Sequence, residues 1–362
     1  MSDKTYTGAI KIGLLTVPFG NHATFPEITQ WSGKGEGGHG YDCLSIGAWP
    51  LPEKSASQRG GEDAFVAAHC GDLETFNEAR ASEMKGAMKE AGIEPYSMAL
   101  FENMSTANVS VREQLHKNFE HACRIGSMIG AKYIGTFPGR NEDMSEGDAL
   151  KFFIERIGPK LQKVASDYGL KPFFENCIME GLIGKPGRVV GNVAYCPANF
   201  RRIFDALDGW FMNPDPSHMV WQGIDYEKVL EEFPDRIVEV HAKDAHVLER
   251  WLRPEATRDM EPMPFRPENY DTGIVHDDHP ICQWGAGLYN HAAPGLGDVK
   301  WSKVTGQMRE TGLAERGVPL MVEIEDEAFS PRSPGADNCA KAAFAVAIRT
   351  LRPYCSADQY LL

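Results

Sequence analysis

The sequence predicts a single parallel (β/α)8 barrel, the TIM-barrel fold, over residues 1–362. Eight short apolar runs alternate with segments of helical periodicity, and no linker interrupts the alternation. The length suits one large barrel with insertions, and a hydrophobic content of 42% is enough for a full core. No GxGxxG motif follows the first run, which argues against a dinucleotide-binding domain.

The eight predicted strands are short apolar runs bounded by glycine, proline or polar residues. They are expected at residues 9–15, 41–47, 93–100, 132–137, 171–176, 210–215, 236–241 and 319–324. The glycine-rich segment between the first two strands, residues 33–38, lacks the spacing of a phosphate-binding loop. We interpret it as a mobile connection.

Seven helices are predicted between and after these strands. They are expected at about residues 73–91, 111–130, 149–168, 198–207, 226–233, 301–311 and 338–351. In the second and third, apolar residues recur at steps of three and four, which marks one helical face. Pro159 predicts a kink or a break within the third helix. His116 and His121 fall outside the apolar stripe of the second helix, so we expect both to face solvent.

Residues 245–299 form a long connection without sustained periodicity, rich in Pro, Gly, His and Trp. Connections of this length inside a compact domain are usually functional. This one follows the seventh strand, so we interpret it as a lid or a subunit contact. Its histidines His276, His279 and His291 are candidates to line such a lid, but solvated loop residues are the favoured expectation.

The charge and composition of the chain indicate which kinds of binding partner and which cellular compartment to expect. The formal net charge of -14 argues against nucleic acid or an anionic membrane surface as the main partner. No apolar run approaches the roughly 20 residues that span a bilayer, and the first seven residues are too polar for a signal peptide. The eight cysteines are scattered without a CxxC pair, so a cytoplasmic protein with reduced thiols is expected.

Four metal-capable side chains stand at the ends of the last four predicted strands: Glu175, Asp215, His241 and Glu323. Side chains alternate along a strand, so these four converge at the carboxyl-terminal mouth if that face is the barrel interior. Three carboxylates brought together repel one another unless a cation compensates them. Three oxygen ligands and one imidazole favour Mn²⁺, with Mg²⁺, Co²⁺ or Zn²⁺ as alternatives.

Two further residues are candidates for binding substrate. Lys243 shares the inward parity of His241 and is expected either to bind a substrate oxygen or to form a salt bridge at the barrel rim. His218 lies three residues after Asp215, and a substrate contact is favoured over a helix-capping role.

Five segments carry a resemblance to a known family. They are Phe174-Glu175-Asn176, Asp215-Pro216-Ser217-His218, Val240-His241-Ala242-Lys243-Asp244, Pro294-Gly295-Leu296-Gly297-Asp298 with Trp301, and Val322-Glu323-Ile324-Glu325-Asp326. With them the chain resembles the xylose isomerase-like TIM-barrel superfamily, in particular its sugar phosphate isomerase/epimerase group. The resemblance implies that Glu175, Asp215, His241 and Glu323 bind the metal, that the two glutamates also move protons, and that His218 contacts a substrate oxygen. Two features depart from the family: Cys177 stands where a histidine is common, and the connection after the seventh strand is longer.

The resemblance favours a metal-dependent sugar or keto-sugar isomerase or epimerase. Metal chelation acidifies the carbon-bound proton and stabilises an enediolate, while one glutamate takes the proton and the other returns it. The alternative is a lyase on a keto sugar or keto-inositol, either a dehydratase or a C-glycoside-cleaving subunit. Aromatic residues of the long connection, such as Trp251 and Tyr270, could then hold an aglycone or a small partner subunit. A homo-oligomer is also compatible.

Two other readings are disfavoured. A DNA-repair endonuclease needs more metal ligands and a basic face, neither of which the sequence offers. A non-catalytic binding protein would have no reason to keep all four ligands.

Overall fold

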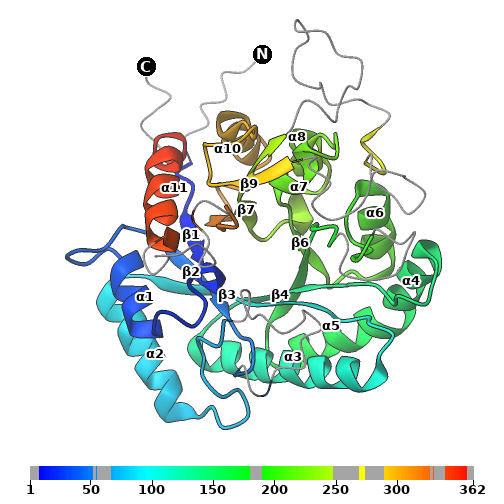
Figure 1. The fold of residues 1–362 in the computed structure, drawn as a ribbon, viewed down its shortest axis with the longest axis horizontal. Coiled ribbons are helices and arrows are strands. Elements are labelled where there is room, and N and C mark those ends of the chain that lie inside the picture. The colour runs from blue at the N-terminus through cyan, green and yellow to red at the C-terminus, as the bar shows by residue number, and fades with distance from the viewer. Residues whose placement is uncertain are drawn as a thin grey trace, which may run out of the picture.

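The computed structural model describes residues 8–51, 54, 67–179, 190–247, 269–273, 289–326, 329 and 339–356. Eight parallel strands form one sheet in the order β6-β5-β4-β3-β2-β1-β10-β7. An isolated parallel bridge between Met212 and Ile237 links the two ends of this order, next to β6 and β7. The strands lie inside a ring of helices, as Figure 1 shows. The predicted barrel is confirmed.

The barrel strands are shorter than predicted at several places. They are β1 (Ile12–Leu15), β2 (Cys43–Gly47), β3 (Glu94–Asn103), β4 (Tyr133–Phe137), β5 (Lys171–Glu175), β6 (Phe211–Asn213), β7 (Val240–Ala242) and β10 (Leu320–Val322). The predicted seventh strand began at residue 236, but Pro234–Arg236 forms a 3-10 turn there. Proline fixes φ and favours such a turn, so pairing with β10 starts only at Val240.

Helices follow most of the strands. They are α1 (Phe25–Ser32), α2 (Glu78–Ala91), α3 (Val109–Ile129), α4 (Glu146–Phe152), α5 (Gly158–Asp167), α6 (Pro197–Ala206), α7 (Pro216–Val220), α8 (Tyr226–Glu232), α10 (Trp301–Glu310) and α11 (Cys339–Cys355). α1 was not predicted, although the sequence carries its start signal. Thr24 and Glu27 form a capping box at its amino terminus.

The predicted helix at residues 149–168 is divided. A π-helical turn, Phe153–Ile157, separates α4 from α5, and Pro159 lies in the first turn of α5. Proline has no N–H and its ring crowds the carbonyl one turn earlier, so the wider π turn accommodates it. The predicted break is confirmed. No helix in the described part of the chain is long and apolar enough to cross a membrane.

The expectation that His116 faces solvent is wrong. His116 on α3 is 8% exposed, not solvated. Its Nε2 lies 3.0 Å from the carbonyl oxygen of Met104, and its Nδ1 lies 3.1 Å from Nζ of Lys160. These polar partners replace water and allow the ring to be buried on a face that the apolar stripe does not cover.

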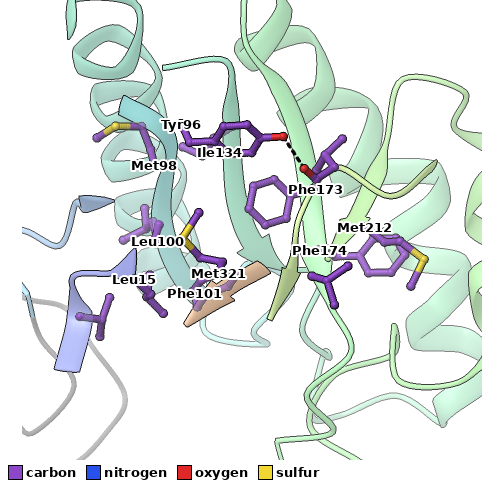
Figure 2. Close-up of a cluster of buried hydrophobic side chains, with 14 of the residues drawn as sticks. Leu15, Tyr96, Met98, Leu100, Phe101, Ile134, Phe173, Phe174, Met212 and Met321 are labelled. Atoms are coloured by element: carbon purple, nitrogen blue, oxygen red, sulfur yellow. Dashed lines mark hydrogen bonds between the residues drawn. The ribbon is translucent and has the colours of Figure 1, made fainter. Parts of the chain in front are cut away.

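The barrel interior below the mouth is filled by large apolar side chains, several of which Figure 2 shows. The rings of Phe101 and Phe173 lie 6.3 Å apart edge to face. Gly135 on β4 makes room for them, because a Cβ there would approach Phe173 to 2.5 Å and Phe101 to 2.8 Å. Phe101 also contacts the ring of His241, at 5.7 Å between centroids. The apolar core therefore ends directly beneath the four predicted ligands.

The long connection after β7 is not wholly irregular. It begins with strand β8 (Asp244–Val247) and returns through strand β9 (Tyr289–Ala292), and the two pair antiparallel. This β8–β9 hairpin was not predicted. Trp251, His276 and His279 lie outside the described residues.

Candidate metal centre

The four predicted ligands lie at the carboxyl-terminal ends of adjacent strands. Glu175 is the last residue of β5, Asp215 follows β6 by two residues, His241 is the middle residue of β7 and Glu323 directly follows β10. All four are buried, with at most 8% exposure. One ligand atom from each lies within 4.8 Å of the others. The structure therefore brings together the residues that strand parity selected.

Asp215 is fixed in place by its neighbours. Its Oδ1 accepts a hydrogen bond from the backbone N–H of Ser217 at 2.8 Å and caps α7, which leaves Oδ2 for the centre. The side chain of Asn176 accepts from the N–H of Asp215 at 2.5 Å and donates to its carbonyl at 3.2 Å. Asn176, the residue after Glu175, thus holds the backbone of Asp215 in place and aligns the ends of β5 and β6.

Three glutamates surround the ring of His241: Glu175 and Glu323 lie beside Nδ1, and Glu239 lies beside Nε2. Its Nδ1 lies 2.9 Å from Oε2 of Glu323 and 3.5 Å from Oε1 of Glu175. Its Nε2 lies 3.6 Å from Oε1 of Glu239, which is fully buried. Nδ1 is therefore the ring nitrogen directed at the centre, and Glu239 faces the other nitrogen.

Glu239 itself is held by two hydrogen bonds. Ser97 Oγ donates to it at 2.7 Å and Asn213 Nδ2 at 3.3 Å. Strand parity places Glu239 on the inward face, but the sequence alone indicates no role for it. Its position two residues before a metal-capable histidine was the available signal.

The residues present fit a divalent cation. Glu175 Oε1, Asp215 Oδ2, His241 Nδ1 and Glu323 Oε2 are all buried and make no hydrogen bond of standard geometry among the described residues, although they lie within ion-pair distance of one another or of Lys243. Buried polar atoms without hydrogen bonds are costly, and a cation bound between these atoms would satisfy them. Three carboxylates and one imidazole suit Mn²⁺, Mg²⁺, Co²⁺ or Zn²⁺.

Lys243 and His218 lie beside the ligands. Nζ of Lys243 is 3.1 Å from Oδ2 of Asp215, 3.3 Å from Oε2 of Glu323 and 3.0 Å from Nε2 of His218. It also donates to Oε2 of Glu325 at 2.9 Å. Lys243 is therefore a buried ammonium within the cluster. The salt bridge, one of the two alternatives for this residue, is present but lies inside the mouth, and the substrate contact stays a prediction.

Burial and charge set the protonation states of the cluster. Burial alone would raise the pKa of Glu175, but the Lys243 ammonium and His241 outweigh it and hold the pKa below its usual value. Burial raises the pKa of Asp215, although the Lys243 ammonium acts to lower it. Burial, reinforced by the Lys243 ammonium, lowers the pKa of His218 to about 3. The His218 imidazole is therefore neutral near pH 7 and can donate or accept a hydrogen bond.

The protonation of His241 couples to ion binding. Burial acts against its charged form, yet Glu323 and Glu175 raise the pKa of His241 well above its usual value when no ion compensates them. A ligating nitrogen must be unprotonated. Binding of a divalent ion at Nδ1 would therefore require His241 to lose a proton.

The β8–β9 hairpin lies next to the centre. Tyr289 stacks on Trp221, with centroids 4.6 Å apart and planes at 10°. His291 meets His218 edge to face at 6.2 Å, and its Nε2 lies 3.5 Å from Oε2 of Glu325. His291, expected to be solvated, is in fact largely buried, because strand pairing turns it towards the mouth.

Known proteins that resemble this chain have the same barrel fold. A family model described as "Xylose isomerase-like TIM barrel" matches residues 40–346. The chain belongs to this family. No curated protein matches the sequence.

Several solved structures share the fold of this xylose isomerase-like barrel. A probable 3-DHS dehydratase, AsbF, from Bacillus anthracis has a TM-score of 0.61 at 12% identity, over 94% of this chain and 98% of its own. The IOLI protein with a binding zinc atom has a TM-score of 0.60 at 13% identity, over 95% and 99%. A sugar phosphate isomerase/epimerase from Parabacteroides distasonis has a TM-score of 0.55 at 14% identity, over 98% of both chains. At these identities the likeness concerns the fold.

Proposed function

We propose that the protein is a divalent-metal-dependent sugar or keto-sugar isomerase or epimerase, with Glu175, Asp215, His241 and Glu323 as the metal ligands. The observation that supports it most is the set of four buried ligand atoms without hydrogen bonds at the barrel mouth. The zinc named for the IOLI structure and the sugar isomerase/epimerase neighbour agree with this proposal. We favour Mn²⁺ because oxygen ligands predominate.

In this proposal the two glutamates transfer protons in opposite directions. Glu175 and Glu323 come from β5 and β10, which flank the β6–β7 pair in the barrel. A bound divalent ion would polarise the substrate carbonyl and acidify the adjacent C–H group. One glutamate removes this proton and the other returns it. Return to the opposite face of the same carbon gives an epimer, and return to the neighbouring carbon gives the isomer.

His218 and Lys243 complete this arrangement on the substrate side. The neutral imidazole of His218 can hydrogen-bond a hydroxyl group, and the ammonium of Lys243 can stabilise negative charge that develops on a substrate oxygen. The ring of Phe101 lies against His241 from below and excludes water from that side. The protein thus orients a polyhydroxylated carbonyl compound above its apolar core.

Deuterium exchange tests the proposal. The Mn²⁺-loaded protein is incubated in D₂O with a panel of ketoses and 3-keto sugars, and deuterium at the carbon next to the carbonyl is measured by NMR. We expect exchange with at least one sugar, and we expect Glu323→Gln to abolish it while Mn²⁺ still binds. Glu102→Gln is the control, because Glu102 is buried but bonds Trp49 instead of the cluster. Unchanged conversion by metal-loaded Glu323→Gln would refute the proton-transfer role.

A lyase is the second candidate. Tyr289 on the hairpin is partly exposed, stacks on the buried Trp221 and contacts the ring of His291, so it offers one aromatic face that suits an aromatic leaving group. The fold shared with a probable 3-DHS dehydratase agrees with this candidate. The same abstraction of a proton then expels a β-substituent as water or as an aglycone. Detection of a released group in the same assays, instead of an isomeric sugar, would favour this candidate.

A further inference from the structure

The β8–β9 hairpin presents different faces to the barrel and to solvent. In its register Ala245 lies opposite His291, and His246 lies opposite Asn290. Residues directly opposite on antiparallel strands share a face. His246 and Asn290 are exposed, whereas Ala245 is buried and His291 is largely buried. His291 is therefore directed at the barrel mouth and His246 away from it.

Several hydrogen bonds hold this hairpin in place. The carboxylate of Asp244 accepts from the N–H of Gly295 at 2.9 Å, from the N–H of Val299 at 3.0 Å and from the indole of Trp301 at 3.0 Å. Asp298 accepts from the N–H of Val247 at 2.7 Å. The position of His291 over the mouth is consequently fixed at both ends of the hairpin.

His291 and Glu325 form a polar pair that the proposed proton transfer does not use. Nε2 of His291 lies 3.5 Å from Oε2 of Glu325, which in turn accepts from Lys243. Nδ1 of His291 is buried and has no hydrogen-bond partner among the described residues. A buried ring nitrogen without a partner is costly, so a group that enters the mouth is its natural partner.

Carboxylates outnumber the positive charges at this mouth, even when the two charges of a bound divalent ion are added to that of Lys243. Glu175, Asp215, Glu323 and Glu325 are four carboxylates in one cluster. Among the described residues that form ion pairs with them, Lys243 is the only lysine or arginine. A phosphate group brought beside Glu325 would add two like charges, whereas a hydroxyl group can donate to this carboxylate.

We propose that His291 and Glu325 bind the hydroxyl groups of the substrate that lie farther from the metal, and that they select an unphosphorylated sugar over its phosphate ester. This inference rests on the proposed function and names its substrate class. The hairpin supplies His291 and the segment after β10 supplies Glu325, so specificity arises where the long connection meets the barrel.

Calorimetry on the Mn²⁺-loaded protein tests this inference. The probes are D-fructose, D-tagatose and D-psicose, each paired with its 6-phosphate, and binding is compared with proton exchange for the same sugars. We expect at least one free ketose to bind about tenfold or more tightly than its phosphate, and Glu325→Gln to reduce this ratio. We expect His291→Phe to weaken binding of that ketose about tenfold, and His291→Asn to restore part of it through an amide near the position of Nδ1.

His246→Phe is the matched control, since His246 lies on the same hairpin and faces away. It should leave sugar binding unchanged, and all three histidine variants should keep the wild-type affinity for Mn²⁺. Equal or tighter binding of the phosphate esters, equal effects of His291→Phe and His246→Phe, or no binding by any pair would overturn the inference. Selective binding of a free ketose without any proton exchange would instead refute the proposed function and leave the selectivity intact.

Discussion

Glu239→Gln tests how the protein orients His241, its proposed histidine ligand. Glu239 is fully buried 3.6 Å from Nε2 of His241, while Nδ1 of the same ring faces the other ligands. A carboxylate on the second nitrogen of a ligating histidine fixes the tautomer and makes the ligand more basic, and losing it costs about 10-fold to 100-fold in metal affinity. The separation of 3.6 Å is longer than a hydrogen bond, so we expect the lower end, about tenfold or 1.4 kcal/mol.

The assay is calorimetric titration of the metal-free protein with Mn²⁺. Thermal unfolding of each metal-free variant verifies that the fold survives, since glutamine can keep hydrogen bonds to Ser97 and Asn213. Glu102→Gln makes the same exchange at another buried glutamate that does not contact His241 and should bind Mn²⁺ like the wild type. An affinity of Glu239→Gln within twofold of the wild type, or an equal loss in Glu102→Gln, would refute the reasoning.

Three further predictions concern stability. Mn²⁺ at 100 times its Kd should raise the free energy of unfolding by about 2.7 kcal/mol, and EDTA should reverse this in denaturant titrations; an unchanged midpoint would contradict a site for Mn²⁺. Burial lowers the pKa of His69 to about 4, so stability should fall as pH drops from 6.5 towards 4, by roughly 3 kcal/mol at most, and the slope should flatten in His69→Gln. Gly135→Ala should cost about 1–3 kcal/mol, because its Cβ would meet Phe173 and Phe101, whereas Gly86→Ala, open to solvent in α2, should gain roughly 0.8 kcal/mol in urea titrations. Equal effects at the two glycines would contradict the packing argument.

Strand periodicity was sufficient to predict the barrel and the convergence of four side chains. This succeeded because side chains alternate strictly along a strand and parallel strands end at one edge, so Glu175, Asp215, His241 and Glu323 needed only local patterns. The metal-binding and catalytic roles of these residues stay predictions.

Features that depend on contacts between distant segments were not predictable in the same way. The β8–β9 hairpin is short and interrupted by about forty residues of sequence, so no local period marks it, and the position of His291 follows from that pairing. His116 was misplaced because its burial depends on Met104 and Lys160, which lie on other elements. Strand parity indicated that Glu239 points inward. Its position beside Nε2 of His241, and the hydrogen bonds that hold it there, could be seen only in the structure.

The closure of the barrel lies between β6 and β7, and two proposed ligands stand on its two sides. There the isolated bridge between Met212 and Ile237 is supplemented by the N–H of His241, which donates to the carbonyl of Pro214 at 3.0 Å. An ion bound by both Asp215 and His241 would strengthen this junction between β6 and β7. It would add a second connection between the first six strands and the last two, which already pair through β1 and β10. Occupancy of the site would then limit the motion of β6 relative to β7, so the proposed catalytic ion would also stabilise the closed barrel.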